Sequence, residues 1–261
     1  MLNLTVNIFN DASTSYFHNS IGGYHGAKMQ RYQDLIDFHI QNEIQNIAQT
    51  LQGKNAQATI DKTLKTQEVL NMLNTRHIIY RKDAAPLQNK FALGNAWFVN
   101  EYKFVEDAMA EIKALNNFNP AKTAVIDKDF KDKVNITNVQ KDTSGVIRLS
   151  QYEPNHLAYQ FKADNDQLVV FSEVYYPKGW KLLVDGEERD LFRANYILRA
   201  AVIPAGEHTV EMKFEPKSYY VGNTIAGYSS IMLLVLVFGV LGYEVYRWYN
   251  NQVLYSTNNK K

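Results

Sequence analysis

A long uncharged segment near the C-terminus constrains this chain more than any other feature. Residues 218–243 contain no Asp, Glu, Lys or Arg, and the most apolar part of the segment is 225–243. As a helix, 225–243 would rise ~28 Å, close to the ~30 Å hydrocarbon core of a bilayer. We therefore predict a transmembrane helix with its flanks at 218–249, followed by a tail at 250–261.

A buried helix of a soluble domain is the alternative interpretation of this segment. Its glycines, among them Gly239 and Gly242, weaken a soluble helix but are tolerated in spanning helices. Aromatic residues stand on both sides, Tyr219 and Tyr220 before it and Trp248 after it, as expected at two membrane interfaces. The C-terminal position excludes a signal peptide.

Charges around the segment favour one orientation only weakly. Lys213 and Lys217 precede it, whereas Arg247, Lys260 and Lys261 follow it. The excess of positive charge on the C-terminal side favours a cytoplasmic tail. The chain has no cysteine, so no disulfide stabilises its fold.

The overall charge excludes one class of partner. The chain carries 28 Lys and Arg against 27 Asp and Glu, a net charge of +1. A balanced charge gives no basis for binding nucleic acid, which requires a basic surface. The 217 residues before the uncharged segment are long enough for one or two domains with hydrophobic cores.

Residues 1–127 alternate between strand and helix patterns. The isoleucines of 36–47 recur on one face of a helix. We predict strands at 2–9, 76–80, 97–99 and 123–126, and helices at 27–52, 66–73 and 103–115. This alternation predicts an α/β layer domain at 1–127, followed by a charged connector at 128–143.

From residue 144 the pattern changes to a period of two. We predict seven short strands at 146–152, 156–162, 167–175, 180–184, 189–192, 197–203 and 209–214. Asp185-Gly186 is the signature of a type I′ hairpin. The spacing predicts a small antiparallel β-sandwich of carbohydrate-binding or Ig-like shape at 144–217. The fold class is therefore α+β with one C-terminal transmembrane helix, and the sandwich should lie at the bilayer surface.

Several long motifs resemble one family of membrane proteins. They are DASTSYFHNSIGGYHGAKMQRYQDLID (11–37), VLNMLNTRHIIY (69–80), ALGNAWFV (92–99), NPAKTAVIDKDF (119–130), SEVYYPKGWKLLVDGEERDLFRANYILRAAVIPAG (172–206) and FEPKSYYVGNTIA (214–226). Together they resemble the C-terminal extracytoplasmic portion and last transmembrane helix of a YfhO-family protein of the Bacteroidetes type.

This resemblance implies a bacterial inner-membrane protein similar to GT-C glycosyltransferases. Such enzymes transfer a sugar from a polyprenyl-phosphate carrier, here for modifying a cell-envelope glycan. Their acidic catalyst lies in an early extracytoplasmic loop of a transmembrane region that this chain does not contain. The resemblance thus implies a chain inactive by itself, with its bulk in the periplasm and its C-terminus in the cytoplasm.

The same resemblance implies a set of partners. They are the lipid bilayer, the missing transmembrane portion of the same protein, and a lipid-linked sugar or envelope glycan. No cofactor is implied.

The polar loop 11–31 is the first candidate for substrate contact. The candidate residues are His18, Tyr24, His25, Lys28 and Arg31. Lys28 and Arg31 are three residues apart at the start of the predicted helix, so they could share a face and hold a phosphate. The alternative is that the loop docks on the missing membrane portion. The spacing of Asp11, His18 and His25 matches no metal-ligand signature, and we predict no metal site.

The segment around Pro177 is the second candidate. Tyr176 and Trp180 could stack on a sugar ring, although an aromatic residue of a small sandwich more often fills its core. Nearby, Arg193 could pair with an acid, and Asn195 suits a turn with positive φ; both fit structural roles.

Three functional hypotheses remain open from the residues. The chain could be an accessory part of a sugar transferase, a membrane-anchored module that binds glycan or protein, or a brace for a transmembrane bundle. It carries no hydrolase, metalloprotease or phosphate-loop motif and no cysteine nucleophile, so we predict no catalytic residue.

Overall fold

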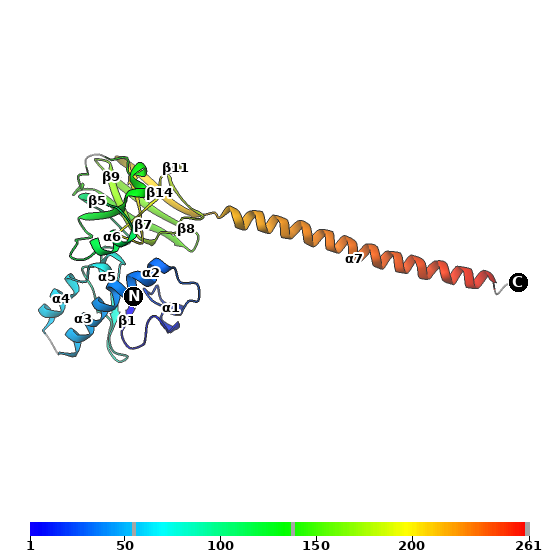
Figure 1. Cartoon of the computed structure of the whole chain (residues 1–261), viewed down its shortest axis with the longest axis horizontal. Helices are drawn as coiled ribbons and strands as arrows, with labels where there is room; N and C mark the ends of the chain where they lie inside the picture. The colour runs from blue at the N-terminus through cyan, green and yellow to red at the C-terminus, as the bar shows by residue number, and fades with distance from the viewer. Residues whose placement is uncertain (54–55, 137–138, 259–261) are drawn as a thin grey trace. The chain divides into compact units, whose positions relative to one another are not determined.

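A computed structural model describes residues 1–53, 56–136 and 139–258 of the chain. Lys260 and Lys261 of the predicted tail, and positions 137–138 of the predicted connector, lie outside these residues. The chain divides into two units, Met1–Phe214 and Glu215–Lys261. Each is described by itself below (Figure 1).

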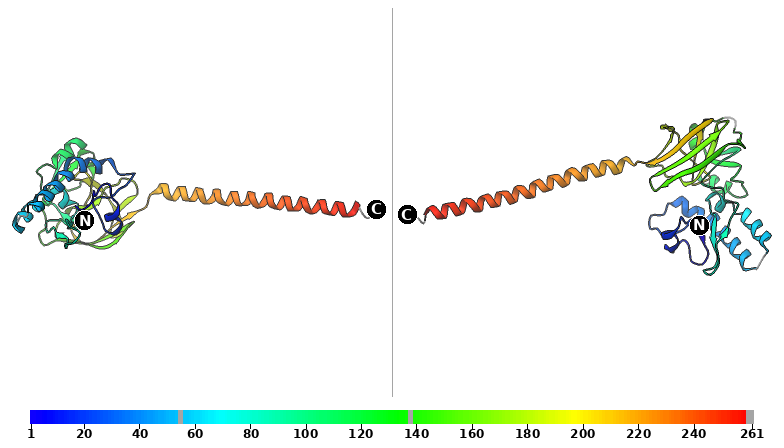
Figure 2. Two further views of the ribbon diagram at one scale, coloured as in Figure 1. Left: turned by 90° about the horizontal axis from the view of Figure 1, so that it is seen from below. Right: turned by 180° about the vertical axis from the view of Figure 1, so that it is seen from behind.

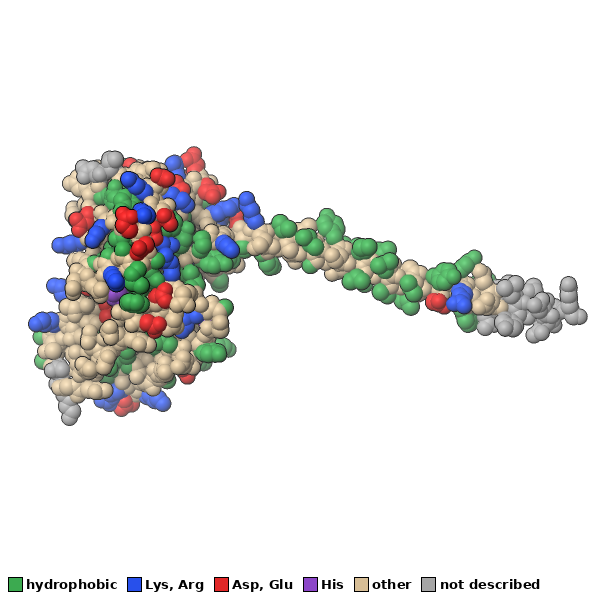
Figure 3. Space-filling model, in the orientation of Figure 1, with side chains coloured by type: hydrophobic (Ala, Val, Ile, Leu, Met, Phe, Trp, Pro, Cys, Tyr) green, Lys and Arg blue, Asp and Glu red, His purple; other side chains and the backbone are tan. Residues whose placement is uncertain are grey.

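The second unit consists of one helix, α7 (Lys217–Asn258), of 42 residues. Its part Lys217–Asn251 is long and apolar enough to span a membrane, and none of its most apolar stretch is buried by the protein. Figure 3 shows hydrophobic side chains along most of this helix. An ion pair between Glu244 and Arg247 (3.8 Å) follows the apolar part directly. The prediction of one candidate spanning helix is confirmed.

The N-terminal part of Met1–Phe214 is mainly helical. Its elements are β1 (Leu2–Asn3), α1 (Ser13–Phe17), α2 (Gln30–Leu35), the π-helix η1 (Ile36–Ile40), α3 (Gln41–Gln52), α4 (Gln57–Lys65), α5 (Glu68–Met72), β2 (His77–Ile79) and β3 (Leu87–Gln88). The segments α2, η1 and α3 follow one another without a break, and their residues Ile36, Ile40 and Ile47 are buried as the periodicity predicts. The strands β1, β2 and β3 form a small sheet in that order.

A β–α–β unit follows. It comprises β5 (Glu101–Val105), α6 (Ala108–Ala114) and β6 (Thr123–Asp127), and the two strands pair in parallel. A short 3-10 helix, η2 (Lys128–Lys133), then occupies part of the predicted connector. Strands and helices thus alternate in this part of the chain, as the sequence predicts for an α/β layer.

Residues 146–214 form the predicted antiparallel strands, gathered on one side of the unit (Figure 2). They are β7 (Val146–Glu153), β8 (His156–Ala163), β9 (Gln167–Val174), β10 (Trp180–Val184), β11 (Glu187–Arg189), β12 (Phe192–Ala194), β13 (Leu198–Ile203) and β14 (Gly206–Phe214). One sheet has the order β11-β10-β14-β8-β7. The other has the order β12-β13-β9-β4, where β4 is Ala96–Phe98.

The four-stranded sheet is buried on both faces. Along β9, Leu168 and Val170 pack into the core shared with the N-terminal helices, whereas Val169 and Phe171 pack into the core between the two sheets. Alternate side chains of a strand point to opposite faces, so a run of apolar residues is needed where both faces are covered. The unit therefore has three layers: the helical layer and the two sheets.

The strand β4 ties the two halves of this unit together. It comes from the N-terminal half and pairs antiparallel with β9, with Trp97 opposite Val170. The Trp97 indole N–H also donates to the carbonyl of Pro120 at 2.7 Å. Residues 1–214 are accordingly one compact unit. The finer division into a domain at 1–127 and a sandwich at 144–217 stays a prediction.

Three sequence predictions of secondary structure differ from the structure. The strand predicted at 2–9 is limited to β1, because the Asn3 side chain accepts hydrogen bonds from the Thr5 amide (3.0 Å) and hydroxyl (2.8 Å) and turns the chain. The helix predicted at 103–115 begins only at Ala108, because Lys103–Val105 belong to β5. The strand predicted at 189–192 is the crossing between β11 and β12.

Two predicted turns are confirmed. Asp185 (φ 51°) and Gly186 (φ 88°) both have positive φ and join β10 to β11, as a type I′ hairpin requires. Asn195 also has positive φ (49°), and its amide oxygen accepts from the Val125 N–H at 2.9 Å. This turn therefore fixes the chain after β12 against β6.

Candidate functional site

The loop before α2 folds over a largely apolar hollow of about 330 Å³, here called the loop hollow. It brings together two of the predicted site residues, His25 and Lys28. The other residues that line it are Phe9, Ser20, Ile21, Gly22, Gly23, Met29, Tyr32 and Val174. The predicted loop therefore does form a concavity, within the size range of small-ligand sites.

A glycine pair holds this loop in place. A Cβ on Gly22 would overlap the carbonyl oxygen of Ile8, and Gly23 has φ of 134°, which side chains rarely adopt. The Gly23 amide donates to the same Ile8 carbonyl at 2.7 Å. On the opposite side, the Tyr32 hydroxyl donates to the Ile21 carbonyl. The wall of the loop hollow is thus fixed by backbone contacts.

Lys28 supplies the positive charge of the loop hollow. Its ammonium group donates to the Gln33 amide oxygen at 3.1 Å and lies 5.7 Å from the centre of the Phe9 ring. Neither partner is a carboxylate, so the charge is available to an anion. His25 stands nearby, and its Nδ1 accepts from the Ala27 N–H at 3.1 Å. An apolar wall beside an ammonium group suits an amphiphilic anion.

The structure does not bring the whole predicted set together. His18 lines a separate hollow with Tyr16, Asn74 and Arg76. The Tyr24 side chain is 70% exposed. Among the described residues, no group of three His, Asp or Glu side chains is placed to hold a metal ion.

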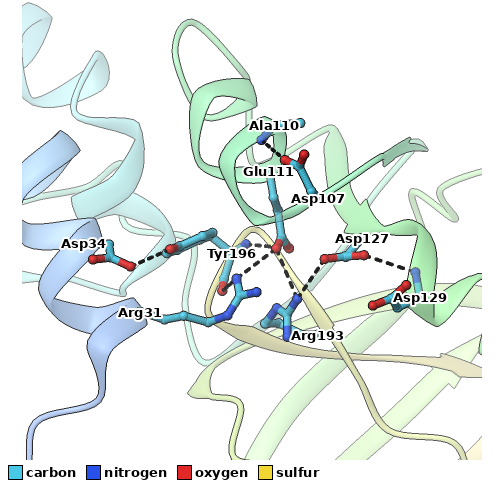
Figure 4. A network of polar contacts seen from close by, with 9 residues as sticks. All are labelled: Arg31, Asp34, Asp107, Ala110, Glu111, Asp127, Asp129, Arg193 and Tyr196. Carbon is cyan, nitrogen blue, oxygen red and sulfur yellow. Dashed lines mark hydrogen bonds and ion pairs between the residues drawn. The ribbon is translucent and has the colours of Figure 1, made fainter.

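Arg31 belongs to a different site, a charged network between the layers (Figure 4). Its Nη1 lies 3.1 Å from Oε2 of Glu111, a side chain with no exposed surface. Arg193 contacts the same oxygen at 3.3 Å and Asp127 at 3.3 Å. The Tyr196 N–H donates to the other Glu111 oxygen at 3.1 Å. The expectation that Arg193 pairs with an acid is confirmed, and Arg31 and Lys28 have separate partners.

The network joins elements that are distant in sequence. Arg31 lies on α2, Glu111 on α6, Asp127 at the end of β6, and Arg193 on β12. Burial raises the pKa of Glu111, while the two guanidinium groups and the Tyr196 N–H oppose this rise. The Arg31 guanidinium also stacks over the Tyr196 ring at 4.6 Å. A charge so enclosed acts mainly to fix the layers.

The second predicted site lies at one end of the sandwich. Tyr176 is 41% exposed, whereas Trp180 is half-buried. The Arg199 guanidinium covers one face of the Trp180 ring at 3.9 Å, and the Phe214 ring lies 5.3 Å from it. Trp180 therefore has a packing role on that face, and Tyr176 is the aromatic ring with free surface.

Residues that sequence reasoning missed line both candidate sites. Phe9, Tyr32 and Val174 complete the loop hollow, and they lie up to 165 residues apart. A second hollow beside Tyr176 and Trp180 includes Glu188 and Asp190. The sequence marked the first site through His25 and Lys28 alone. The second site was marked by Tyr176 and Trp180, whereas Glu188 and Asp190, at the far side of the β10–β11 hairpin, carried no signal in the sequence.

The fold and the helix together define a membrane protein with a mixed α/β unit of 214 residues and one candidate spanning helix among the described residues. Residues 115–226 match the model of a protein family described as bacterial membrane protein YfhO. This match confirms the resemblance to YfhO-family membrane proteins, and it runs from the end of α6 through the sandwich into α7. No curated protein and no solved structure matches the chain.

Proposed function

We propose that this chain is the extracytoplasmic portion and last helix of a GT-C-like membrane glycosyltransferase that uses a polyprenyl-phosphate-linked sugar. The family match, which continues from the sandwich into the spanning helix, supports a membrane role for both units. In this proposal the acidic catalyst belongs to a membrane-embedded portion outside this chain. The bulk of the chain lies in the periplasm, its C-terminus is cytoplasmic, and the acceptor is a cell-envelope glycan.

The loop hollow is the observation that carries the substrate part of the proposal. A polyprenyl phosphate has an apolar chain and an anionic head, and the hollow offers an apolar wall with Lys28 and His25. Lys28 has no carboxylate partner among its described contacts, which leaves its charge for the phosphate. The exposed Tyr24 on the same loop would lie near the head group.

Binding to the full chain in lipid nanodiscs tests this role. The probe is a short-chain polyprenyl phosphate, compared with the free polyprenol and with inorganic phosphate. We expect Lys28→Ala to weaken binding of the polyprenyl phosphate by about tenfold, the loss expected for one charge-assisted hydrogen bond. Lys62→Ala, which changes an exposed lysine on α4, is the matched control and should leave binding unchanged. Equal binding of phosphate ester and free alcohol would contradict the proposal.

A transfer assay tests where catalysis resides. The chain by itself should not transfer sugar from a polyprenyl-phosphate donor, because the proposed acidic catalyst is elsewhere. Turnover by this chain alone would show that its own residues carry the chemistry.

A non-catalytic role is the second candidate, and one observation favours it. Arg31, predicted from the sequence as a phosphate ligand, is engaged by the buried Glu111 instead. A membrane-anchored module for binding glycan or protein, or a brace for a transmembrane bundle, needs only such a rigid unit. It predicts that Lys28→Ala alters assembly or stability and leaves binding of polyprenyl phosphate intact.

A further inference from the structure

Two hollows meet along one edge of the sandwich and form a continuous groove, here called the sandwich-edge groove. The larger has a volume of about 440 Å³ and includes Asp166 and Pro204; the smaller, of about 160 Å³, includes Tyr176 and Trp180. Both are lined by Lys133, Glu188, Arg189 and Asp190. The larger hollow is in the size range of ligand sites.

The topology explains why this edge is open. The strand β11 is the outermost strand of the five-stranded sheet, and β12 is the outermost strand of the four-stranded sheet. Both have only three residues, and Asp190 and Leu191 cross between them. The turn before β9 and the turn before β14 lie at one end of the groove, and the loop 175–180 lies at the other. The groove therefore suits a linear ligand.

The side chains of the groove indicate the chemistry of that ligand. Tyr176 offers a partly exposed ring, on which the C–H face of a sugar can stack. The side chains of Glu188 and Asp190 are exposed, and among the described residues neither carboxylate forms a hydrogen bond or ion pair, although the backbone of Glu188 belongs to β11. Free carboxylates at fixed positions accept hydrogen bonds from hydroxyl groups.

The charge balance narrows the ligand further. Across both hollows, the acids Asp166, Glu188 and Asp190 are balanced in number by the bases Lys133, Lys181 and Arg189, so the lining has no net charge. A surface without a net charge offers no general attraction to a polymer rich in phosphate or carboxylate groups. A peptide would need apolar pockets for its anchor side chains, and the groove offers mainly polar walls.

We propose that the sandwich-edge groove binds a neutral oligosaccharide, with Tyr176 as the stacking ring and Glu188 and Asp190 as hydroxyl acceptors. This site is separate from the loop hollow and requires no transferase activity. In this proposal Tyr176 contacts the ligand. Trp180, whose ring is covered by Arg199, packs beneath the loop 175–180 instead.

The test uses the full chain in nanodiscs on an immobilised panel of neutral oligosaccharides, acidic oligosaccharides and acidic and basic peptides. We expect retention on at least one neutral oligosaccharide and no retention on acidic ones. Tyr176→Ala should weaken that binding by about tenfold, whereas Tyr176→Phe should keep most of it, because stacking needs the ring and not the hydroxyl. Asp190→Asn should weaken binding, because an amide is a poorer acceptor than a carboxylate.

The matched control is Tyr152→Ala. Tyr152 is 52% exposed on the same sandwich, but it lies on β7, at the opposite edge of the five-stranded sheet. Its loss should leave oligosaccharide binding unchanged. The proposal is overturned if only peptides or only acidic glycans retain the protein. It is also overturned if wild type and Tyr176→Ala are retained equally on the neutral oligosaccharide. Because Tyr176→Phe and Asp190→Asn conserve shape, a folding defect of Tyr176→Ala would not hide the result.

Discussion

At the scale of single residues, the buried carboxylates show how this protein uses charge for architecture. Glu111 has no exposed side-chain surface, yet it accepts from two arginines and one backbone N–H. Sequence alone could not predict this site, because Arg31 lies 80 residues from Glu111 and Arg193 lies 82 residues from it. Only Arg193 carried a local hint, because Asn195, a residue type that suits a turn, follows it two positions later.

The first prediction concerns Glu111. Glu111→Ala should lower the free energy of unfolding by about 3 kcal/mol, because it leaves two buried guanidinium groups and the Tyr196 N–H without their acceptor. Glu111→Gln should lower the free energy of unfolding by less, since the amide keeps an acceptor oxygen. Burial also raises the pKa of Glu111, which reduces the advantage of a charged side chain over a neutral one. Urea denaturation of the chain in detergent measures both. The control Glu106→Ala, which breaks the exposed pair with Lys128, should change almost nothing.

The second prediction concerns pH. Burial raises the pKa of Glu43 from 4.5 to about 7, although its carboxylate accepts from the N–H groups of Val69 (2.9 Å) and Leu70 (2.8 Å). The unfolded chain therefore ionises first, and the stabilisation that protonated Glu43 provides is lost as pH rises from about 4.5 to about 7.

Glu43→Gln removes this titration. The stability advantage of the wild type over Glu43→Gln should thus shrink by about 3 kcal/mol between pH 4.5 and pH 8. Unfolding curves at several pH values measure the difference. An advantage that grows with pH would show that the two N–H donors outweigh burial.

At the scale of elements, the periodicity of apolar residues predicted those strands and helices whose pattern is set by neighbouring residues in the sequence. The alternation of 146–214 predicted the sandwich strands, because side chains there face a core on at least one side. It failed for β5, where Phe104, Ala108, Ile112 and Leu115 have helical spacing but the first of them pairs with Ile126 in a parallel strand. Periodicity also missed α4, which has only nine residues and buries only Leu64. Pairing partners far along the chain decide such cases.

The third prediction concerns the loop before α2. Gly22→Ala should displace this loop, because the added methyl group overlaps the Ile8 carbonyl. We expect faster hydrogen exchange at residues 20–25 and weaker binding of polyprenyl phosphate. Gly26→Ala is the control, since nothing lies within 4 Å of its Cβ position. Equal exchange rates in the two variants would show that the loop tolerates the methyl group.

At the scale of the whole molecule, the candidate spanning helix follows directly from the sequence, whereas its orientation stays a prediction. Lack of charge over 218–243 is a local property, whereas orientation depends on a small difference in flanking lysines and arginines. The structure extends the helix to Asn258, beyond the predicted flank at 249. At 1.5 Å per residue, its 42 residues rise ~63 Å, about twice the hydrocarbon core. The helix is therefore longer than a crossing of the hydrocarbon core requires.

The fourth prediction uses the absence of cysteine from the chain. Single-cysteine variants Lys178→Cys, on the sandwich, and Asn251→Cys, on α7, should react oppositely with a membrane-impermeant maleimide. In spheroplasts, Lys178→Cys should be labelled at once, and Asn251→Cys only after detergent is added. The reverse pattern would place the bulk of the chain in the cytoplasm and contradict the proposed orientation.

The strand β4 determines which part of the chain can be expressed without exposing a sheet edge. The family match begins at residue 115, after Ala96–Phe98. The matched stretch therefore begins inside the compact unit Met1–Phe214 and lacks β4. A fragment limited to 115–226 would present the unpaired edge of β9, Val169 to Phe171, to other chains, and such edges recruit strands from neighbours. The four-stranded sheet is complete only with β4, which precedes the matched stretch.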